Sequence, residues 1–209
     1  MDRLESWSGL YRHRNNVKAR YPRIWDVPLV KKEMDRLLPN IKDGDSVLEV
    51  GAGDRRFEAK IMASGVSVEY RSMDIDPETR QDYRSLDGIA EGFDLVFMFE
   101  LIEHLTPDEG LVMLKKVRGL LKPGGRVLIG TPNLYHPHRY FGDITHKTPY
   151  KYEELGALMM MAGFGDINVY RVYNDAYLRR AFRLSVGIWL HKYLDIDFAG
   201  SILAEGAAG

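Results

Sequence analysis

Residues 47–54, Val47-Leu48-Glu49-Val50-Gly51-Ala52-Gly53-Asp54, decide the fold. A short apolar strand runs into two glycines and then into a segment of helical character, which is typical of an open α/β sheet. Glycine lets the backbone approach a ligand because it has no Cβ. Turns of this kind lie at the carboxyl ends of strands, where open α/β sheets bind ligands. We therefore predict a ligand site at this turn, with a purely structural tight turn as the alternative.

Strand-like and helix-like segments alternate along the rest of the chain. The predicted strands lie at 46–50, 68–74, 83–87, 93–99, 126–130, 167–172 and 201–205. The predicted helices lie at 27–38, 57–63, 106–121, 151–162 and 177–194. Such alternation predicts βαβ units and a mainly parallel sheet. The start of the helix after residue 106 is well defined, since Thr106, Pro107 and Glu109 fit the cap, first and third helical positions of a capping box.

Length and composition indicate one globular domain spanning 1–209. The 209 residues carry a net charge of -1, and 28% of them are charged. Cysteine is absent, which excludes a disulfide framework and a thiol nucleophile. The first ten residues lack the apolar centre of a signal peptide, and no run approaches the roughly 20 apolar residues of a membrane span. We expect a cytoplasmic protein.

The turn does not fit a dinucleotide. The dinucleotide pattern is G-x-G-x-x-G, and Arg56 occupies the position of its last glycine. The acidic Glu49 just before the turn would also be a poor neighbour for a pyrophosphate. It suits a ligand with a positive ammonium or sulfonium group. A nicotinamide-dependent oxidoreductase is therefore disfavoured.

Five pieces of the sequence, in order, resemble the class I S-adenosylmethionine-dependent methyltransferases. They are LEVGAGDRRF at 48–57, MDIDP at 73–77, FDLVFMFELIEHL at 93–105, LKPGGRVLIGTPN at 121–133 and MAGF at 161–164. Within that class the chain is most similar to the small-molecule branch that includes the ubiquinone-biosynthesis-type O-methyltransferases. The likeness covers about residues 45–165. One position departs from it, because Arg55 stands where the family's glycine turn has its third glycine.

The resemblance implies a fold and a cofactor site. The fold would be a Rossmann-like, doubly wound, mainly parallel seven-stranded sheet, with its last strand antiparallel and helices on both faces. S-adenosyl-L-methionine would be the cofactor, with Asp74 accepting hydrogen bonds from its ribose, Ile75 packing on its adenine and Asp87 meeting the adenine amino group. The other implied cofactor-binding residues, around the methionine part, are Glu49, Gly51, Ala52, Gly53, Phe99, Glu100 and Leu101.

Three residues are candidates for catalysis. If the methyl acceptor is a hydroxyl, a general base helps, and histidine is the usual choice near neutral pH. Asp143 and His146 resemble an Asp-x-x-His element of related enzymes, in which Asp143 would orient His146 as the base. His104 follows the fourth predicted main strand, beside the implied cofactor. Each of the three could instead have a purely structural role. Asp143 and His146 could form a hydrogen bond that stabilises the loop, and His104 could cap or pack against the following helix.

No metal ion is expected. The histidines at 136, 138 and 146, together with Asp143, offer donors, but their spacing fits no tight structural zinc pattern.

The acceptor side would be built by three segments, 1–40, 131–150 and 173–198. We expect a small-molecule methyl acceptor that is methylated on oxygen. The alternatives are an RNA methyltransferase that uses the basic segment 11–32, and an S-adenosylmethionine-binding protein without catalysis. Nucleic acid is disfavoured by the near-zero net charge. Residues 177–194 form a basic amphipathic stretch, which suits peripheral membrane contact, cover for the substrate, packing on its own domain or a homodimer interface.

Overall fold

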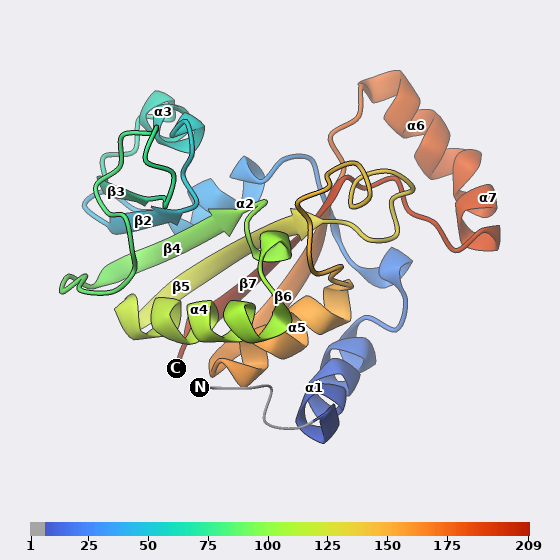
Figure 1. The fold of residues 1–209 in the computed structure, drawn as a ribbon. Helices are drawn as coiled ribbons and strands as arrows, with labels where there is room; N and C mark the ends of the chain where they lie inside the picture. The colour runs from blue at the N-terminus through green and yellow to red at the C-terminus, as the bar shows by residue number, and fades with distance from the viewer. Residues whose placement is uncertain (1–6) are drawn as a thin grey trace.

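The computed structural model describes residues 7–209, so the first six residues of the expected 1–40 segment lie outside the described part. A seven-stranded sheet runs through the molecule in the order β1-β6-β7-β5-β4-β2-β3 (Figure 1). Its strands are β1 Leu29–Val30, β2 Ser46–Val50, β3 Glu69–Met73, β4 Phe93–Phe99, β5 Leu121–Pro132, β6 Phe164–Val172 and β7 Ser201–Ala208. Only β7 runs antiparallel to its neighbours, β5 and β6. The predicted fold class is confirmed.

Helices cover both faces of the sheet. The α-helices are α1 Trp7–Arg20, α2 Met34–Leu37, α3 Arg56–Ala63, α4 Pro107–Leu120, α5 Tyr152–Met161, α6 Tyr177–Ser185 and α7 Gly187–Tyr193. In Figure 1, α4 and α5 lie on one face with α1 against α5, and α2 and α3 lie on the other. Strand β4 contributes side chains to the cores on both faces of the sheet. Val96 and Met98 belong to one buried apolar cluster, and Leu95 and Phe97 belong to the other. Its continuous apolar sequence follows from burial on both faces.

The predicted strand at 83–87 is absent, which corrects the sequence expectation. Tyr83 makes only a single bridge to Met73, and loops connect β3 to β4. The sheet keeps seven strands because β1 forms at the opposite edge, inside the predicted helix 27–38. Pro28 would be tolerated in the first turn of a helix, so it does not decide the outcome; residues 29–30 instead pair with the edge strand β6. The Pro28 carbonyl accepts the Arg171 N–H at 2.7 Å.

The predicted helix at 177–194 is divided into α6 and α7 at Val186 and Gly187. Both helices extend away from the sheet (Figure 1). Several of their outward side chains are large and apolar, since Tyr177 is 83% exposed and Trp189 is 75% exposed. No helix within residues 7–209 is long and apolar enough to cross a membrane.

Candidate active site at the carboxyl edge of the sheet

The glycine turn after β2 is tightly tied to the end of β3. The Met73 carbonyl accepts the N–H groups of Gly51 and Ala52, at 2.8 and 3.2 Å. Gly51 has φ +75°, and a Cβ there would lie 3.1 Å from the Leu101 side chain. Both the left-handed backbone and the closeness of Leu101 therefore require glycine at this position.

Arg55, the departure from the glycine pattern, keeps the turn in its expected form. It adopts φ +57° and ψ +30°, the left-handed conformation that a glycine would supply. For a residue with a Cβ this costs about 1–2 kcal/mol. The guanidinium donates to Glu58 at 2.9 Å, lies 3.6 Å from Asp82 and stacks on the Tyr70 ring at 5.3 Å. These contacts offset the backbone cost.

Asp74 and Ile75 lie beside the turn, as the sequence predicts for cofactor-binding residues. Asp74 Oδ2 accepts the Gly53 N–H at 2.9 Å, and Oδ1 accepts the Asp76 N–H at 2.9 Å. Each oxygen retains a lone pair for a further donor. Ile75 is 78% exposed, so its side chain is free to pack on a flat ring.

Glu49 is buried beneath the turn, on the face that carries α3. It is 4% exposed, and its Oε2 accepts the hydroxyl hydrogen of Tyr70. Burial raises the pKa of Glu49 to about 7, although the Tyr70 hydrogen bond opposes the shift. A buried carboxyl with this pKa gains a favourable partner when a positive group binds near it.

Residues 99–101 have three different environments. Leu101 packs on Gly51, as described above, and thus borders the turn. Phe99 is buried, with its ring 4.9 Å from that of Phe57 on α3. The Glu100 carboxylate accepts the Ser201 hydroxyl at 2.9 Å and pairs with Arg139 at 3.3 Å. Glu100 is therefore engaged with β7 and the 131–150 loop.

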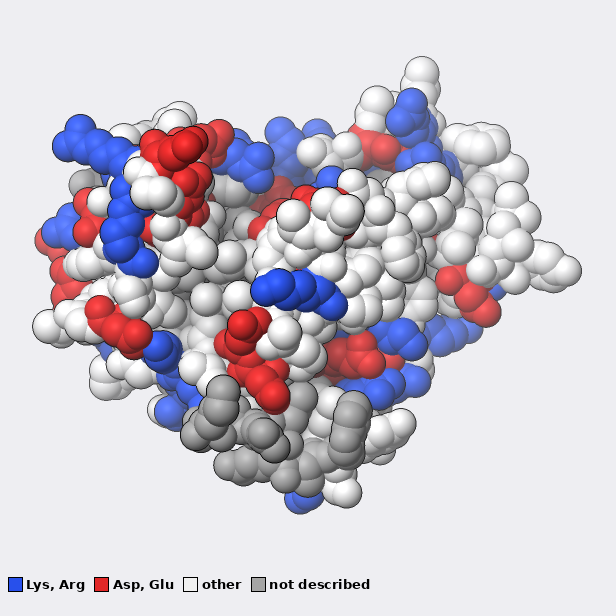
Figure 2. Space-filling model, in the orientation of Figure 1, with Lys and Arg blue, Asp and Glu red and all other residues white. Residues whose placement is uncertain are grey.

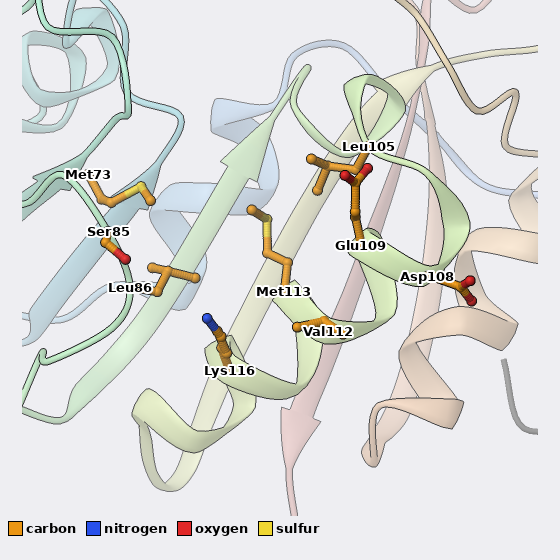
Figure 3. A pocket seen from close by; sticks show the side chains of 9 residues that line it. All are labelled: Met73, Ser85, Leu86, Leu105, Asp108, Glu109, Val112, Met113 and Lys116. Atoms are coloured by element: carbon orange, nitrogen blue, oxygen red, sulfur yellow. The ribbon is translucent and has the colours of Figure 1, made fainter. Parts of the chain in front are cut away.

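Asp87, the residue implied to meet the adenine amino group, lies in the loop between β3 and β4. Its carboxylate pairs with Lys116 of α4 at 2.6 Å and is exposed. Because no strand forms at 83–87, this loop crosses toward α4. An apolar cavity of about 360 Å³ lies between loop and helix, and Met73, Leu86 and Met113 point into it (Figure 3).

Glu103 is a functional candidate that the sequence reasoning missed. It lies in the 3-10 helix Ile102–His104 after β4 and is 0% exposed. Its Oε2 accepts the Thr131 hydroxyl at 3.0 Å, whereas Oε1 has no hydrogen-bond partner within residues 7–209. Burial, with the nearby charge of Glu100, raises the pKa of Glu103 to about 8. The sequence did contain a signal for it, because Glu103 is a charged residue within the mainly apolar stretch that begins at Phe93.

His104 and His146 meet Glu103 at one place. Their rings are 4.9 Å apart, and His146 Nε2 lies 3.9 Å from Glu103 Oε1. Asp143 does not orient His146 in the predicted way. Its Oδ1 accepts the Thr145 N–H and hydroxyl, at 2.8 and 2.6 Å, while His146 Nδ1 bonds to the Tyr140 carbonyl at 2.6 Å.

The loop that carries His146 is anchored at its start by a buried polar network. Asn133 is fully buried and donates to Asp197 at 2.9 Å, and Arg171 pairs with the same carboxylate at 3.1 Å. The Asn133 side-chain oxygen in turn accepts the Tyr135 N–H at 3.1 Å. Histidine 136 takes no part in the His104–His146 group, since its ring packs on Phe198 at 5.5 Å.

Comparisons with known proteins identify the family and support the fold. A family described as "Methyltransferase domain" matches residues 19–183. A search of curated protein sequences gives no match. Similar solved structures include a SAM-dependent methyltransferase from Archaeoglobus fulgidus, with TM-score 0.66 and 19% identity over 97% of this chain and 100% of that one.

Two further solved structures share the fold. Phosphoethanolamine N-methyltransferase 2 of Haemonchus contortus, in complex with S-adenosyl-L-methionine, has TM-score 0.57 and 17% identity over 80% of this chain and 49% of that one. A chain of the Haloferax volcanii complex between the Trm112 methyltransferase activator and a methyltransferase has TM-score 0.61 and 16% identity over 96% of both chains.

Proposed function

This chain belongs to the methyltransferase-domain family and uses S-adenosylmethionine, and from that premise we propose that it methylates a hydroxyl oxygen of a small molecule. The observation that carries the proposal is the meeting of Glu103, His104 and His146 at the carboxyl edge of the sheet. Glu103 and His104 lie in the 3-10 helix just after β4, and His146 reaches them from the 131–150 loop. They are groups that accept or hold a proton, as a hydroxyl acceptor requires.

The residues around the turn fit the cofactor. S-adenosylmethionine supplies a methyl group activated by a sulfonium. At Gly53 no atom of the described chain other than its neighbours lies within 4 Å of where a Cβ would be, so the backbone is open to a ligand there, and Asp74 keeps lone pairs for ribose hydroxyls. Glu49 offers a buried negative charge to the positive part of the ligand. We assign the adenine ring to the region bordered by the exposed side chain of Ile75 on one side and by the apolar cavity on the other. Leu86 is one of the residues that line this cavity.

The loop 131–150 supplies the acceptor side. It carries His146, and the Tyr140 ring lies 5.2 Å from that of His146. Because Nδ1 of His146 faces the Tyr140 carbonyl, it holds the proton and Nε2 is the basic nitrogen. Together with residues 173–198, this loop would cover the acceptor and exclude water. The resemblance to ubiquinone-biosynthesis-type O-methyltransferases supports oxygen as the methylated atom.

The proposal is tested by measuring S-adenosylhomocysteine release with pooled metabolites, grouped as hydroxyl, amine and carbon acceptors. We expect turnover with a hydroxyl pool and none with the amine or carbon pools. Turnover confined to amines, or to added RNA, contradicts the proposal.

RNA methylation through segment 11–32 is less well supported. Arg14 lies 3.6 Å from Glu154, and Arg23 pairs with Asp26 at 3.2 Å, so part of the basic charge is already balanced. Figure 2 shows positive and negative side chains interspersed over the visible face, without a continuous basic surface. Nucleic-acid binding depends on such a surface.

Cofactor affinity should depend on pH through Glu49. Its pKa near 7 makes the carboxyl mostly neutral at pH 6 in the free protein. A bound ammonium or sulfonium favours the charged form, so binding releases a proton below pH 7. We expect the affinity for S-adenosylhomocysteine to rise about tenfold from pH 6 to pH 8. Calorimetric titrations should show this rise, and Glu49→Gln should abolish it. An equal rise in Glu49→Gln contradicts the assignment.

The arm formed by α6 and α7 is proposed to contact an anionic membrane surface. It combines exposed apolar side chains such as Leu178 and Trp189 with the cations Arg179 and Lys192. Replacing Leu178 and Trp189 together by serine should lower the affinity for anionic vesicles about tenfold or more. Vesicle co-sedimentation measures this, with neutral vesicles as the control. Wild-type protein that forms a dimer in solution and ignores vesicles contradicts the membrane assignment.

A further inference from the structure

We propose that Glu103, His104 and His146 form a binding site for a divalent metal ion. Each side chain offers one potential ligand atom, and these atoms lie within 4.8 Å of one another. It is the one such group found within residues 7–209. The sequence expectation of no metal rested on local spacing, whereas 42 positions separate His104 from His146.

The hydrogen bonds of His104 direct a lone pair toward the site. The Thr145 hydroxyl has a single hydrogen, which it donates to Asp143 at 2.6 Å. That hydroxyl also lies 3.0 Å from His104 Nδ1, so there it must act as the acceptor. His104 therefore carries its proton on Nδ1, and Nε2 is left with a lone pair. Asp143 acts through Thr145 as a positioning residue for His104.

His146 also carries its proton on Nδ1 and a lone pair on Nε2, but a different contact fixes this arrangement. A backbone carbonyl has no hydrogen to give, so Nδ1 of His146 donates to the Tyr140 oxygen. Its Nε2 lone pair then faces Glu103 Oε1 at 3.9 Å. Metal-bound histidines usually hold their other ring N–H in this way, against a carbonyl or a carboxylate.

Glu103 supplies the second independent observation. Its side chain is completely buried, and Oε1 has no hydrogen-bond partner in the described chain. An unpartnered buried carboxylate oxygen is costly, and here Oε1 lies 3.9 Å from His146 Nε2, in the group that also contains His104. A cation at their centre satisfies all three atoms, while the Thr131 hydroxyl keeps the other carboxylate oxygen in place.

The ligand set indicates the class of cation. Two imidazole nitrogens and one carboxylate oxygen suit first-row divalent ions such as Mn²⁺, Fe²⁺, Co²⁺ or Zn²⁺. Three protein ligands leave coordination positions open, as in catalytic metal sites. An acceptor hydroxyl bound there would have its pKa lowered and lose its proton to water. This catalytic use rests on the proposed function, whereas the binding of the ion does not.

The test of binding uses Co²⁺, whose visible absorption changes on coordination by nitrogen. Chelator-treated wild-type protein is expected to bind one equivalent by calorimetry, with a new absorption band. Glu103→Gln and His146→Ala should each weaken binding about tenfold or more. His104→Ala, at a half-exposed position, is a second ligand variant with less risk to folding.

His138→Ala is the matched control, because His138 lies on the same loop, is exposed and lies outside the group. It should bind Co²⁺ as the wild type does. Absence of binding in folded wild type, or equal binding in the three ligand variants, overturns the site.

Turnover separates this proposal from the proposed function. Chelator-treated enzyme is expected to lose activity on its hydroxyl acceptor and to regain it with Mn²⁺ or Co²⁺. Full activity after chelation overturns the catalytic use and leaves His146 Nε2 as the base. Tight Co²⁺ binding without turnover on any hydroxyl acceptor refutes the proposed function and leaves the metal site standing.

Discussion

Replacing His146 by alanine is expected to lower turnover about 10²–10⁴-fold, the usual contribution of a positioned base. The side chain is held by the Tyr140 carbonyl, and its Nε2 faces the buried Glu103. Loss of the imidazole removes the group that deprotonates the acceptor, whether directly or as a metal ligand. The affinity for S-adenosylhomocysteine should stay nearly unchanged, because the glycine turn keeps its own contacts.

Steady-state kinetics on the identified acceptor and calorimetry with S-adenosylhomocysteine measure the two parts of this prediction. His138→Ala serves again as the control and should keep wild-type turnover. A His146→Ala enzyme with full turnover removes His146 from the chemistry. If the His146→Ala enzyme instead binds the cofactor weakly but turns over normally once the cofactor is bound, His146 contributes to cofactor binding and not to the chemistry.

Asp74→Ala is expected to weaken S-adenosylhomocysteine binding by about 1–3 kcal/mol, or roughly 5- to 150-fold. The carboxylate is the predicted acceptor for the ribose hydroxyls, and it also fixes the Gly53 N–H of the turn at 2.9 Å. Asp74→Asn should lose less affinity, since its amide keeps one oxygen for either role.

Asp76→Ala is the matched control for this measurement. It removes an exposed carboxylate two positions further along, whose own bond is to the Glu78 N–H at 2.9 Å. We expect its dissociation constant to lie close to that of the wild type. A folded Asp74→Ala protein with unchanged affinity would leave Asp74 only a structural role in the turn.

The elements that were predictable from sequence are those that local patterns determine. Strands β2 and β4 match their predicted limits, because an apolar run bounded by glycines or charges specifies a buried strand. Helix α4 begins at Pro107 with Thr106 as its cap, and both hydrogen bonds of the capping box form. The glycine turn belongs to the same group, since its conformation depends on neighbouring residues.

The features that sequence did not show depend on distant contacts. The two residues of β1 become a strand only because β6, about 140 positions later, offers a free edge. The partner of His146 could not be inferred for a similar reason. Asp143 is nearest in sequence, but Thr145 occupies it, and the group that faces His146 is Glu103 from the end of β4.

The site therefore divides into two parts. The proposed cofactor half was predicted from motifs, and the structure brings its residues Gly51, Asp74 and Ile75 to the carboxyl ends of β2 and β3. The proposed acceptor half is assembled from the end of β4, from β5 and from the 131–150 loop, and it could be proposed only once Glu103, Thr131 and His146 were seen together. The adenine role of Asp87 stays a prediction: its carboxylate pairs with Lys116, and the strand expected at 83–87 does not form.

Methylation on oxygen is tested most directly by locating the transferred methyl group in the product. The wild-type enzyme is supplied with S-adenosylmethionine labelled with a carbon isotope in its methyl group, together with the acceptor found by the metabolite screen. Nuclear magnetic resonance of the isolated product then identifies the atom that carries the label. We expect a labelled carbon bonded to oxygen of a small molecule. A label on nitrogen or carbon, or one that appears only in RNA, would contradict it.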